Sequence, residues 1–254
     1  MPLLHFQEEL KKLVTQNGRP VVVFAAIWPC ARALNVSPKE LPSLLLDLFT
    51  TLIDTTKRDL IMPTFAKGYE NGLCNLDLTP STTGILSENF RQDPTSHRSL
   101  SAFFSFNIKG PNAVEFSNLK PLDAWGDGST YQWMENQNAN FLMLGTHPTH
   151  CSYLHRLEWL CRESIFYRYR KPFHGTIIRN KQDVIMEETL FVRDPLFFND
   201  FTPLNNPLIN GGMISSLVNG LHLSWVDTKT IRNVCVPLIT QDPYIILKKE
   251  STNA

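Results

Sequence analysis

One stretch near the middle of the chain, residues 141–163, constrains the fold because its hydrophobic period changes partway through. The apolar run over residues 141–144 ends at Gly145 and predicts a short buried strand. After the turn residues 146–149, apolar side chains recur at helical spacing and predict a helix with one face on the core. A strand that leads directly into such a helix is typical of α/β proteins, which place ligands and catalytic groups at the carboxyl ends of their strands.

Beside the core face of this predicted helix lie four chemically useful side chains, namely Cys151, His155, Glu158 and Arg162. Residues at spacings of four, three and four stack along one side of a helix. The stripe therefore combines a soft nucleophile, a base, a carboxylate and a cation.

Three interpretations fit this stripe. In the simplest, His155 and Glu158 form an exposed helical pair that contributes roughly a few tenths of a kcal/mol. In the second, zinc is bound by nitrogen and sulfur ligands from His147, His150, Cys151 and His155, although their spacing matches no zinc motif. In the third, Glu158 orients His155 as a general base and stabilises its imidazolium form. The predicted helix alone leaves all three open.

The composition excludes several classes of protein. The 24 basic and 24 acidic residues balance, so neither nucleic acid nor an anionic membrane is an expected partner. The five cysteines are odd in number and scattered, which indicates free thiols in a reducing compartment. No run of about 18 apolar residues and no signal-peptide core is present, so we expect a cytoplasmic protein. The sequence leaves the oligomeric state open, with a homodimer as one candidate.

The rest of the chain predicts the alternating elements of a layered α/β fold. Before the central stretch we expect a helix over 4–16, a strand over 20–26, a helix over 42–54 and a strand over 59–62. Residues 64–138 are rich in turn residues and form a long irregular insertion, which in a compact domain is usually functional. After the central stretch we expect a hairpin over 175–186, a strand over 190–193, a helix over 211–220, and strands over 221–225 and 244–247.

Short phrases in a fixed order run through the irregular region and beyond it. They read DLIMPTF from Asp59, TPSxxGILxExFR from Thr79, RS from Arg98, GxxA from Gly110 and GDGS from Gly126, ahead of His155-x-x-Glu158. In this order and spacing they resemble the aminoglycoside 3-N-acetyltransferase family, which has the antibiotic acetyltransferase fold and is distinct from the GNAT acetyltransferases. The resemblance covers roughly residues 20–235.

The resemblance implies a single domain over residues 1–254, with α/β/α layers around a central mixed sheet. It also implies transfer of an acetyl group from acetyl-CoA to a primary amine of an amino sugar by direct attack. On the matching positions, His155 is expected to be the general base and Glu158 its orienting carboxylate, with no metal. An ammonium cannot attack a thioester until a proton leaves, and a positioned imidazole that accepts it contributes ~10²–10⁴-fold. Cys151 stays open as an acyl-carrying nucleophile, against a buried inert thiol.

The sequence departs from the family pattern in two places. The His-Pro pair that usually follows Arg-Ser is replaced by Ser101-Ala102, and the polar loop after the first strand reads FAAIW from Phe24. Both changes remove polar groups from regions that the resemblance associates with CoA or substrate. We nevertheless place the CoA-binding residues there and at the glycine-rich turn, at Ala26, Ile27, Trp28, Ser99, Ser101, Gly128 and Ser129.

The balanced charge argues weakly against a polycationic substrate, which a protein would meet with an acidic surface. Our candidate substrate-binding residues are Glu88, Arg91 and Asp127, of which the arginine suits phosphate. We therefore expect a nucleotide-linked amino sugar, as in surface-polysaccharide synthesis, rather than an aminoglycoside antibiotic. The alternatives are a catalytically impaired homologue that binds CoA or sugar, and a zinc-dependent hydrolase.

Overall fold

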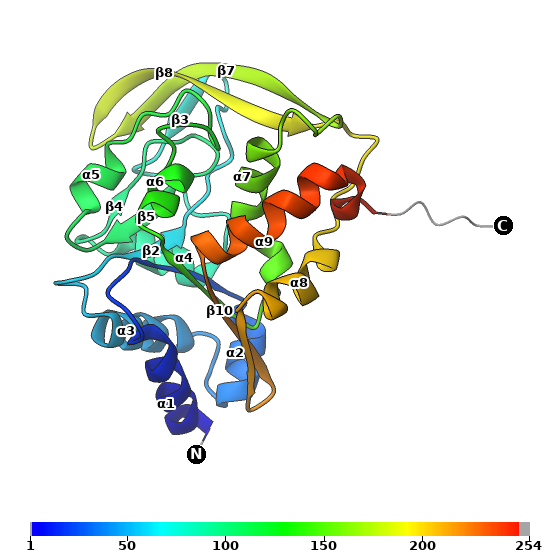
Figure 1. Ribbon diagram of the computed structural model, residues 1–254. Coiled ribbons are helices and arrows are strands. Elements are labelled where there is room, and N and C mark those ends of the chain that lie inside the picture. Colours follow the sequence, from blue (N-terminus) through cyan, green and yellow to red (C-terminus); the bar gives the residue numbers. More distant parts are fainter. Residues whose placement is uncertain (1, 249–254) are drawn as a thin grey trace.

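The computed structural model describes residues 2–248, which form a seven-stranded mixed sheet and a smaller sheet above it (Figure 1). In spatial order the large sheet contains β4 (His97–Arg98), β5 (Phe106–Lys109), β2 (Leu60–Pro63), β1 (Val21–Ala25), β6 (Asn140–Leu144), β10 (Leu221–Asp227) and β9 (Ile214–Val218). The three central strands β2, β1 and β6 are parallel, and antiparallel strands extend the sheet on both sides. The predicted α/β fold with a central mixed sheet is confirmed.

The strands β1 and β6 position the region of interest. All five residues of β6 are buried, because helices cover both faces of the sheet, and its sequence is correspondingly almost continuously apolar. The Ala26 N–H donates to the Leu144 carbonyl at 2.9 Å, so the segments that follow β1 and β6 begin side by side. The two parallel strands therefore end at the same edge of the sheet.

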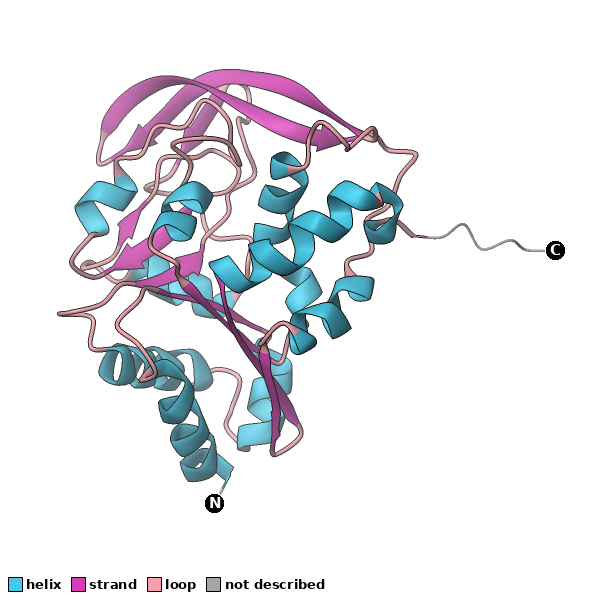
Figure 2. Cartoon of the chain, in the orientation of Figure 1, coloured by secondary structure: helices cyan, strands magenta, loops and turns pink. Residues whose placement is uncertain are grey.

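Helices cover both faces of the large sheet (Figure 2). One face packs against α1 (Pro2–Val14), α2 (Ile27–Leu34), α3 (Leu41–Ile53) and part of α4 (Ile85–Gln92). The other packs against α5 (Ala113–Ser117), α6 (Thr130–Asn136), α7 (Tyr153–Leu160), α8 (Asn205–Asn210) and α9 (Thr228–Gln241). This arrangement gives the layers expected from the sequence. None of the helices among residues 2–248 has the length and apolar character needed to cross a bilayer.

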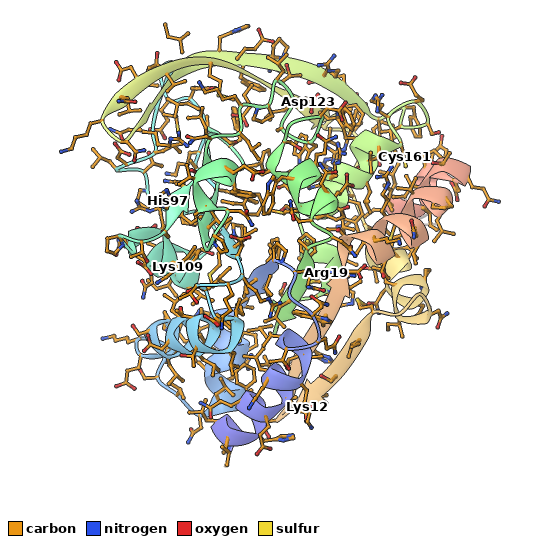
Figure 3. All side chains as sticks on the ribbon, turned by 60° about the vertical axis from the view of Figure 1, so that its left-hand side comes forward. Lys12, Arg19, His97, Lys109, Asp123 and Cys161 are labelled. Carbon is orange, nitrogen blue, oxygen red and sulfur yellow. The ribbon has the colours of Figure 1, made fainter. Side chains whose placement is uncertain are left out.

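The second sheet contains β3 (Leu73–Asn75) and the long antiparallel pair β7 (Arg168–Arg179) and β8 (Gln182–Arg193), which arches over the top of the molecule (Figure 1). Its turn residues Asn180 and Lys181 both have positive φ, as a two-residue turn of type I′ requires. Asp123 lies beneath the arch (Figure 3) and forms a parallel bridge with Thr189 of β8. The hairpin thereby covers the end of the molecule that carries α7.

Three predicted elements differ in the structure. Residues 211–220 are not a helix; they contain β9, whose turn at Asn219 and Gly220 has positive φ and reverses the chain into β10. Residues 190–193 are not a separate strand but the end of β8, and residues 244–247 fall mainly in the 3₁₀ helix Pro243–Ile246. For residues 190–193 the predicted strand conformation is confirmed and only its separation from the hairpin is wrong, whereas at 211–220 and 244–247 tertiary pairing, or its absence, overrode local sequence preference.

The predicted irregular region contains several short elements that are held by a buried arginine. The Arg98 guanidinium donates to the carbonyls of Thr64, Leu76 and Thr79 and to the Ser105 hydroxyl. Burial lowers its pKa to about 10. A single side chain thus satisfies main-chain carbonyls that regular secondary structure would otherwise pair.

Candidate active site

His155 and Glu158 lie one turn apart on α7 and are in direct contact. The His155 Nδ1 is 2.6 Å from Glu158 Oε2. The Glu158 side chain is 0% exposed, whereas the His155 side chain is 31% exposed. The pair is therefore anchored in the core at its carboxylate end and accessible at its imidazole end, so the interpretation as an exposed helical pair is wrong.

The Glu158 carboxylate is surrounded by donors from distant segments. Oε1 accepts from the Tyr167 hydroxyl, Arg168 Nε and Asn199 Nδ2, each at 2.8 Å, and Arg168 Nη2 lies 2.8 Å from Oε2. Burial by itself raises the pKa of this carboxyl, but the hydrogen bonds and charges of His155 and Arg168 outweigh burial and lower the pKa to about 2. Glu158 is consequently an ionised acceptor near neutral pH.

An ionised Glu158 determines the tautomer of His155. Because a carboxylate only accepts hydrogen bonds, His155 Nδ1 must carry the hydrogen between them. In the neutral ring this leaves Nε2 with its lone pair, and no side chain within residues 2–248 makes a hydrogen bond to Nε2. The ring is held edge-on by Trp125 and Phe201, with centroids 5.9 and 5.6 Å away. The accessible nitrogen is thus the basic one.

The His155 ring faces a cavity of about 480 Å³, a size typical of small-molecule sites. The cavity is lined by Phe104, Trp125, His155, Arg168, Leu190, Phe191, Val192, Arg193, Phe198, Asn199 and Lys248. Four of these residues belong to β8, so the arch of the hairpin forms one wall. The base predicted from the sequence therefore has space beside it for an acceptor.

The charged residues that line this cavity are cations. They are Arg168, Arg193 and Lys248, and no carboxylate is among the lining residues. Arg168 is balanced by the buried Glu158, whereas Arg193 and Lys248 form no ion pair in the described part of the chain. Arg193 lies over the Phe198 ring at 5.1 Å. The lining thus carries cations and no carboxylate, and Asp200 lies near enough to Lys248 to interact with its charge.

The other two members of the predicted stripe lie off the helix. Cys151 precedes α7 in extended backbone, with φ −74° and ψ 124°, and is 5% exposed. Burial raises the pKa of its thiol to about 12, so it is an inert core thiol rather than a nucleophile. Arg162 follows the end of α7 and lies over the Trp159 ring at 4.3 Å.

The zinc interpretation has no support. His147 and His150 flank a short 3₁₀ turn with ring centroids 6.5 Å apart, and His147 Nδ1 is 2.7 Å from the Thr149 hydroxyl. Within residues 2–248, no group of three or more His, Cys, Asp or Glu side chains is arranged to hold a metal ion.

A second cavity, of about 860 Å³, lies at the end of β1. Ala26, Ile27 and Trp28, which we predicted to bind the cofactor, form one wall, and residues 83–86 with Asn89 form another. Contrary to the predicted loop, Ile27 and Trp28 begin α2. Lys39 provides a cation, and Trp28 is 71% exposed. This cavity and the His155 cavity share no lining residue.

The remaining predicted cofactor residues line neither of these two cavities. The buried Ser99 hydroxyl accepts a backbone N–H of β5 at 2.9 Å, and the buried Ser101 hydroxyl donates to Glu188. Ser129 is the N-cap of α6, and the exposed Gly128 before it has φ +75°. Each of them therefore has a role in local structure.

The predicted substrate-binding residues also lie outside the His155 cavity. Arg91 donates to Glu88 at 2.8 and 2.7 Å, and the Ser81 N–H donates to the same carboxylate at 2.7 Å. The hydrogen bond from Arg91 is the largest factor that lowers the pKa of Glu88 to about 2. Asp127 is exposed and accepts from the Gln132 amide. The structure does not bring these three residues to His155.

Sequence reasoning missed three residues that contact Glu158 directly, namely Tyr167, Arg168 and Asn199. Asn199 lies 41 residues after Glu158 in the chain, and nothing in its local sequence marks it. Arg168 stands in a basic stretch at the start of β7, which predicts only a solvated strand end. A buried carboxylate requires donors or a cation beside it, but the sequence did not show that Glu158 is buried and so gave no signal for these residues.

Comparison with known proteins agrees with this fold. AAC-IIIb in its binary complex with CoASH matches with a TM-score of 0.76 and 18% identity, over 92% of this chain and 94% of that chain. AAC-VIa bound to sisomicin matches with a TM-score of 0.75 and 15% identity, over 92% of this chain and 96% of that chain. YokD from Bacillus subtilis matches with a TM-score of 0.73 and 18% identity, over 94% of this chain and 98% of that chain. The sequence matches none of the curated proteins. The model of the aminoglycoside 3-N-acetyltransferase family matches residues 54–234, more than half of the chain, so this protein belongs to that family, as the sequence motifs predicted.

Proposed function

We propose that His155 is the general base of an acetyl-CoA-dependent N-acetyltransferase whose acceptor is an amino sugar bearing a negative charge. The observation that carries this proposal is the 2.6 Å contact between His155 Nδ1 and Glu158, which leaves the basic Nε2 at a cavity. Family membership supports the acetyl transfer itself. The ring, its orienting carboxylate and the adjacent space are the three parts that general-base catalysis needs.

In the proposed reaction, His155 Nε2 takes a proton from the acceptor amine as its nitrogen attacks the thioester carbonyl. The new C–N bond forms, the C–S bond breaks, and the sulfur of CoA leaves and is protonated. Glu158 stabilises the imidazolium that exists between the two proton transfers, because its negative charge lies 2.6 Å from Nδ1. Loss of the base therefore removes a contribution of ~10²–10⁴-fold.

We place acetyl-CoA in the cavity beside Trp28. Its walls are largely apolar and its volume of about 860 Å³ suits an extended ligand, while Lys39 can meet a phosphate. AAC-IIIb, which shares the fold, binds CoASH. The hydrogen bond from Ala26 to Leu144 sets this cavity next to the segment that leads from β6 to α7. Of the predicted cofactor residues, Ala26, Ile27 and Trp28 line this cavity.

The charge of the His155 cavity supports an anionic acceptor. A polycation such as sisomicin, which AAC-VIa binds, would bring ammonium groups against Arg193 and Lys248 with no carboxylate among the lining residues. A nucleotide-linked amino sugar instead brings phosphates, which guanidinium and ammonium groups bind well. We therefore favour such a sugar, of the type used in surface-polysaccharide synthesis.

The test is release of free thiol from acetyl-CoA with a panel of nucleotide-linked amino sugars and aminoglycosides. We expect turnover of the nucleotide-linked sugars to exceed that of the aminoglycosides, and His155→Ala to lower kcat by about 10²–10⁴-fold. His150→Ala, which removes an exposed imidazole from the preceding turn, is the matched control, and circular dichroism checks folding.

Other outcomes of this assay separate the alternatives. Turnover of kanamycin-like acceptors alone would overturn the anionic-acceptor proposal while leaving the acetyl transfer intact. Full activity in His155→Ala would overturn the assignment of His155 as the general base. Binding of CoA in calorimetry without thiol release from any acceptor would identify a catalytically impaired homologue.

A further inference from the structure

Like Glu158, Glu188 on β8 carries a carboxyl group with no exposed surface, and it lies two residues before Leu190 in the wall of the His155 cavity. Glu188 is 0% exposed, and no Lys, Arg or His side chain pairs with it within residues 2–248. Its hydrogen-bond partners are the Ser101 hydroxyl at 2.5 Å and the Ala102 N–H at 2.9 Å. The titratable side chains of Tyr69 and Cys74 are near enough to interact with its charge. A polar group without a counter-charge at such a place calls for a physical reason.

The hydrogen bonds around Ser101 match an ionised Glu188. The single hydroxyl hydrogen of Ser101 donates to Glu188, and its oxygen accepts from the N–H groups of Phe103 and Phe104 at 3.2 and 2.8 Å. A hydroxyl offers one donor and two acceptor sites, so every site is used. The carboxylate and the hydroxyl therefore fix the backbone of the turn over residues 101–104 as one unit.

This turn carries an aromatic residue into the cavity wall. The Phe104 ring packs on Trp125 with centroids 4.7 Å apart, and both residues line the His155 cavity. Trp125 in turn lies edge-on to the His155 ring. On β8, the cavity lining begins at Leu190, two residues after Glu188. Glu188 thus joins the two sides of the wall, the hairpin and the aromatic turn.

We propose that Glu188 is a positioning residue for the acceptor cavity, acting through Ser101 to hold Phe104 and Trp125 against the space in front of His155. This inference rests on the proposed function, because it takes that space to be the acceptor site.

Burial raises the pKa of Glu188 to about 7, although the hydrogen bonds from Ser101 and Ala102 oppose this shift. Burial thus favours the neutral acid, while the surrounding donors fit the carboxylate. A protonated Glu188 needs an acceptor that Ser101, with both lone pairs in use, does not offer. The hydrogen bonds of the turn therefore fit the ionised group, while burial opposes its ionisation.

Hydrogen–deuterium exchange tests the structural link without reference to activity. In Glu188→Gln the amide retains the shape, but its N–H₂ group opposes a donor, so one contact is lost. We expect faster exchange at the amides of residues 102–104 and no change in α7. Glu187→Gln, on the adjacent and 46% exposed side chain of the same strand, is the control and should leave both segments unchanged. Ser101→Ala tests the same link from its other end.

Steady-state kinetics tests whether the link matters to the acceptor. We expect Glu188→Gln and Ser101→Ala each to raise the KM for the acceptor, lowering kcat/KM about tenfold, with the KM for acetyl-CoA unchanged. The double variant should be no worse than either single one, because both disrupt one unit. A purely structural role would instead lower kcat/KM for the acceptor and for acetyl-CoA together.

Each outcome decides the proposal. Unchanged exchange at residues 102–104 in both variants, additive losses in the double variant, or faster exchange with an unchanged acceptor KM would overturn it. Failure of the proposed function is separate, because it would show as full thiol release by His155→Ala, whatever the exchange experiment gives.

Discussion

Glu158 on α7 and Glu188 on β8 are both 0% exposed, yet their pKa values are shifted in opposite directions. Glu158 has its pKa lowered to about 2, and Glu188 has its pKa raised to about 7. Burial is the largest influence on both groups and raises the pKa of each. The difference comes from the partners. Glu158 contacts Arg168 and His155, whereas the hydrogen-bond partners of Glu188 among residues 2–248 are a hydroxyl and a backbone N–H.

The comparison shows that burial alone does not tell what a carboxyl group does. A buried carboxylate with a cation beside it is a fixed negative charge that can orient a base. A buried carboxyl with neutral donors is a group that titrates near neutrality and can hold a turn. In our proposal, the same residue type therefore performs two different tasks on two sides of one cavity.

The largest effect on stability is expected from Glu158→Gln. This change leaves the 6% exposed Arg168 side chain buried without its counter-charge, so the free energy of unfolding should fall by about 3–5 kcal/mol. Tyr167→Phe removes one hydrogen bond to the same carboxylate and no charge, and serves as the matched control with a smaller loss. Chemical denaturation at pH 7 measures both. Equal losses in the two variants would show that the ion pair contributes nothing of its own.

Acid should next reveal the lowered pKa of Glu158. Because its folded pKa is below the ordinary 4.5, its stabilising effect is present above pH ~4.5 and is lost as the pH falls toward 2. The total loss is ~3 kcal/mol. The difference in unfolding free energy between wild type and Glu158→Gln, followed from pH 7 to pH 3, should shrink with acid. A difference that does not vary with pH would contradict the assigned ion pair.

Glu188 should produce a dependence of opposite sign. Its folded pKa is above the ordinary 4.5, so its contribution to stability is complete below pH ~4.5 and is lost as the pH rises to about 7, by up to ~3 kcal/mol. Relative to Glu188→Gln, the wild type should therefore lose stability over this range, and Glu187→Gln should follow the wild type. If the free energy of unfolding of wild type and of Glu188→Gln varied with pH in the same way, Glu188 would not have a raised pKa and the contrast with Glu158 would be lost.

The smallest effect concerns Glu88, whose pKa is also lowered to about 2. Its pair with Arg91 has the same i,i+3 helical spacing as His155 and Glu158 but lies outside the His155 cavity. Glu88→Gln should lower stability by about 1 kcal/mol and leave kcat and both KM values within about twofold. A raised KM for the acceptor would place Glu88 in the substrate site, as the sequence first suggested.

Local sequence determined the central part of the site. The change from a strand pattern to a helical pattern over residues 141–163 placed His155 after β6, and helical spacing placed Glu158 one turn away. These are short-range properties, because strand and helix periods are set by residues two to four positions apart. The layered α/β fold and the family motifs were visible for the same reason.

Only the tertiary structure decided what surrounds the pair. The burial of Glu158, its contacts with Arg168 and Asn199, the cationic cavity and the role of Glu188 all join segments that are distant in the chain. The strand Ile214–Val218 was predicted as a helix for the same reason, because its pairing with β10 decided its conformation. Composition and spacing carry no information on which distant segment supplies a counter-charge. Here the packing of the hairpin over α7 brings Arg168 to Glu158.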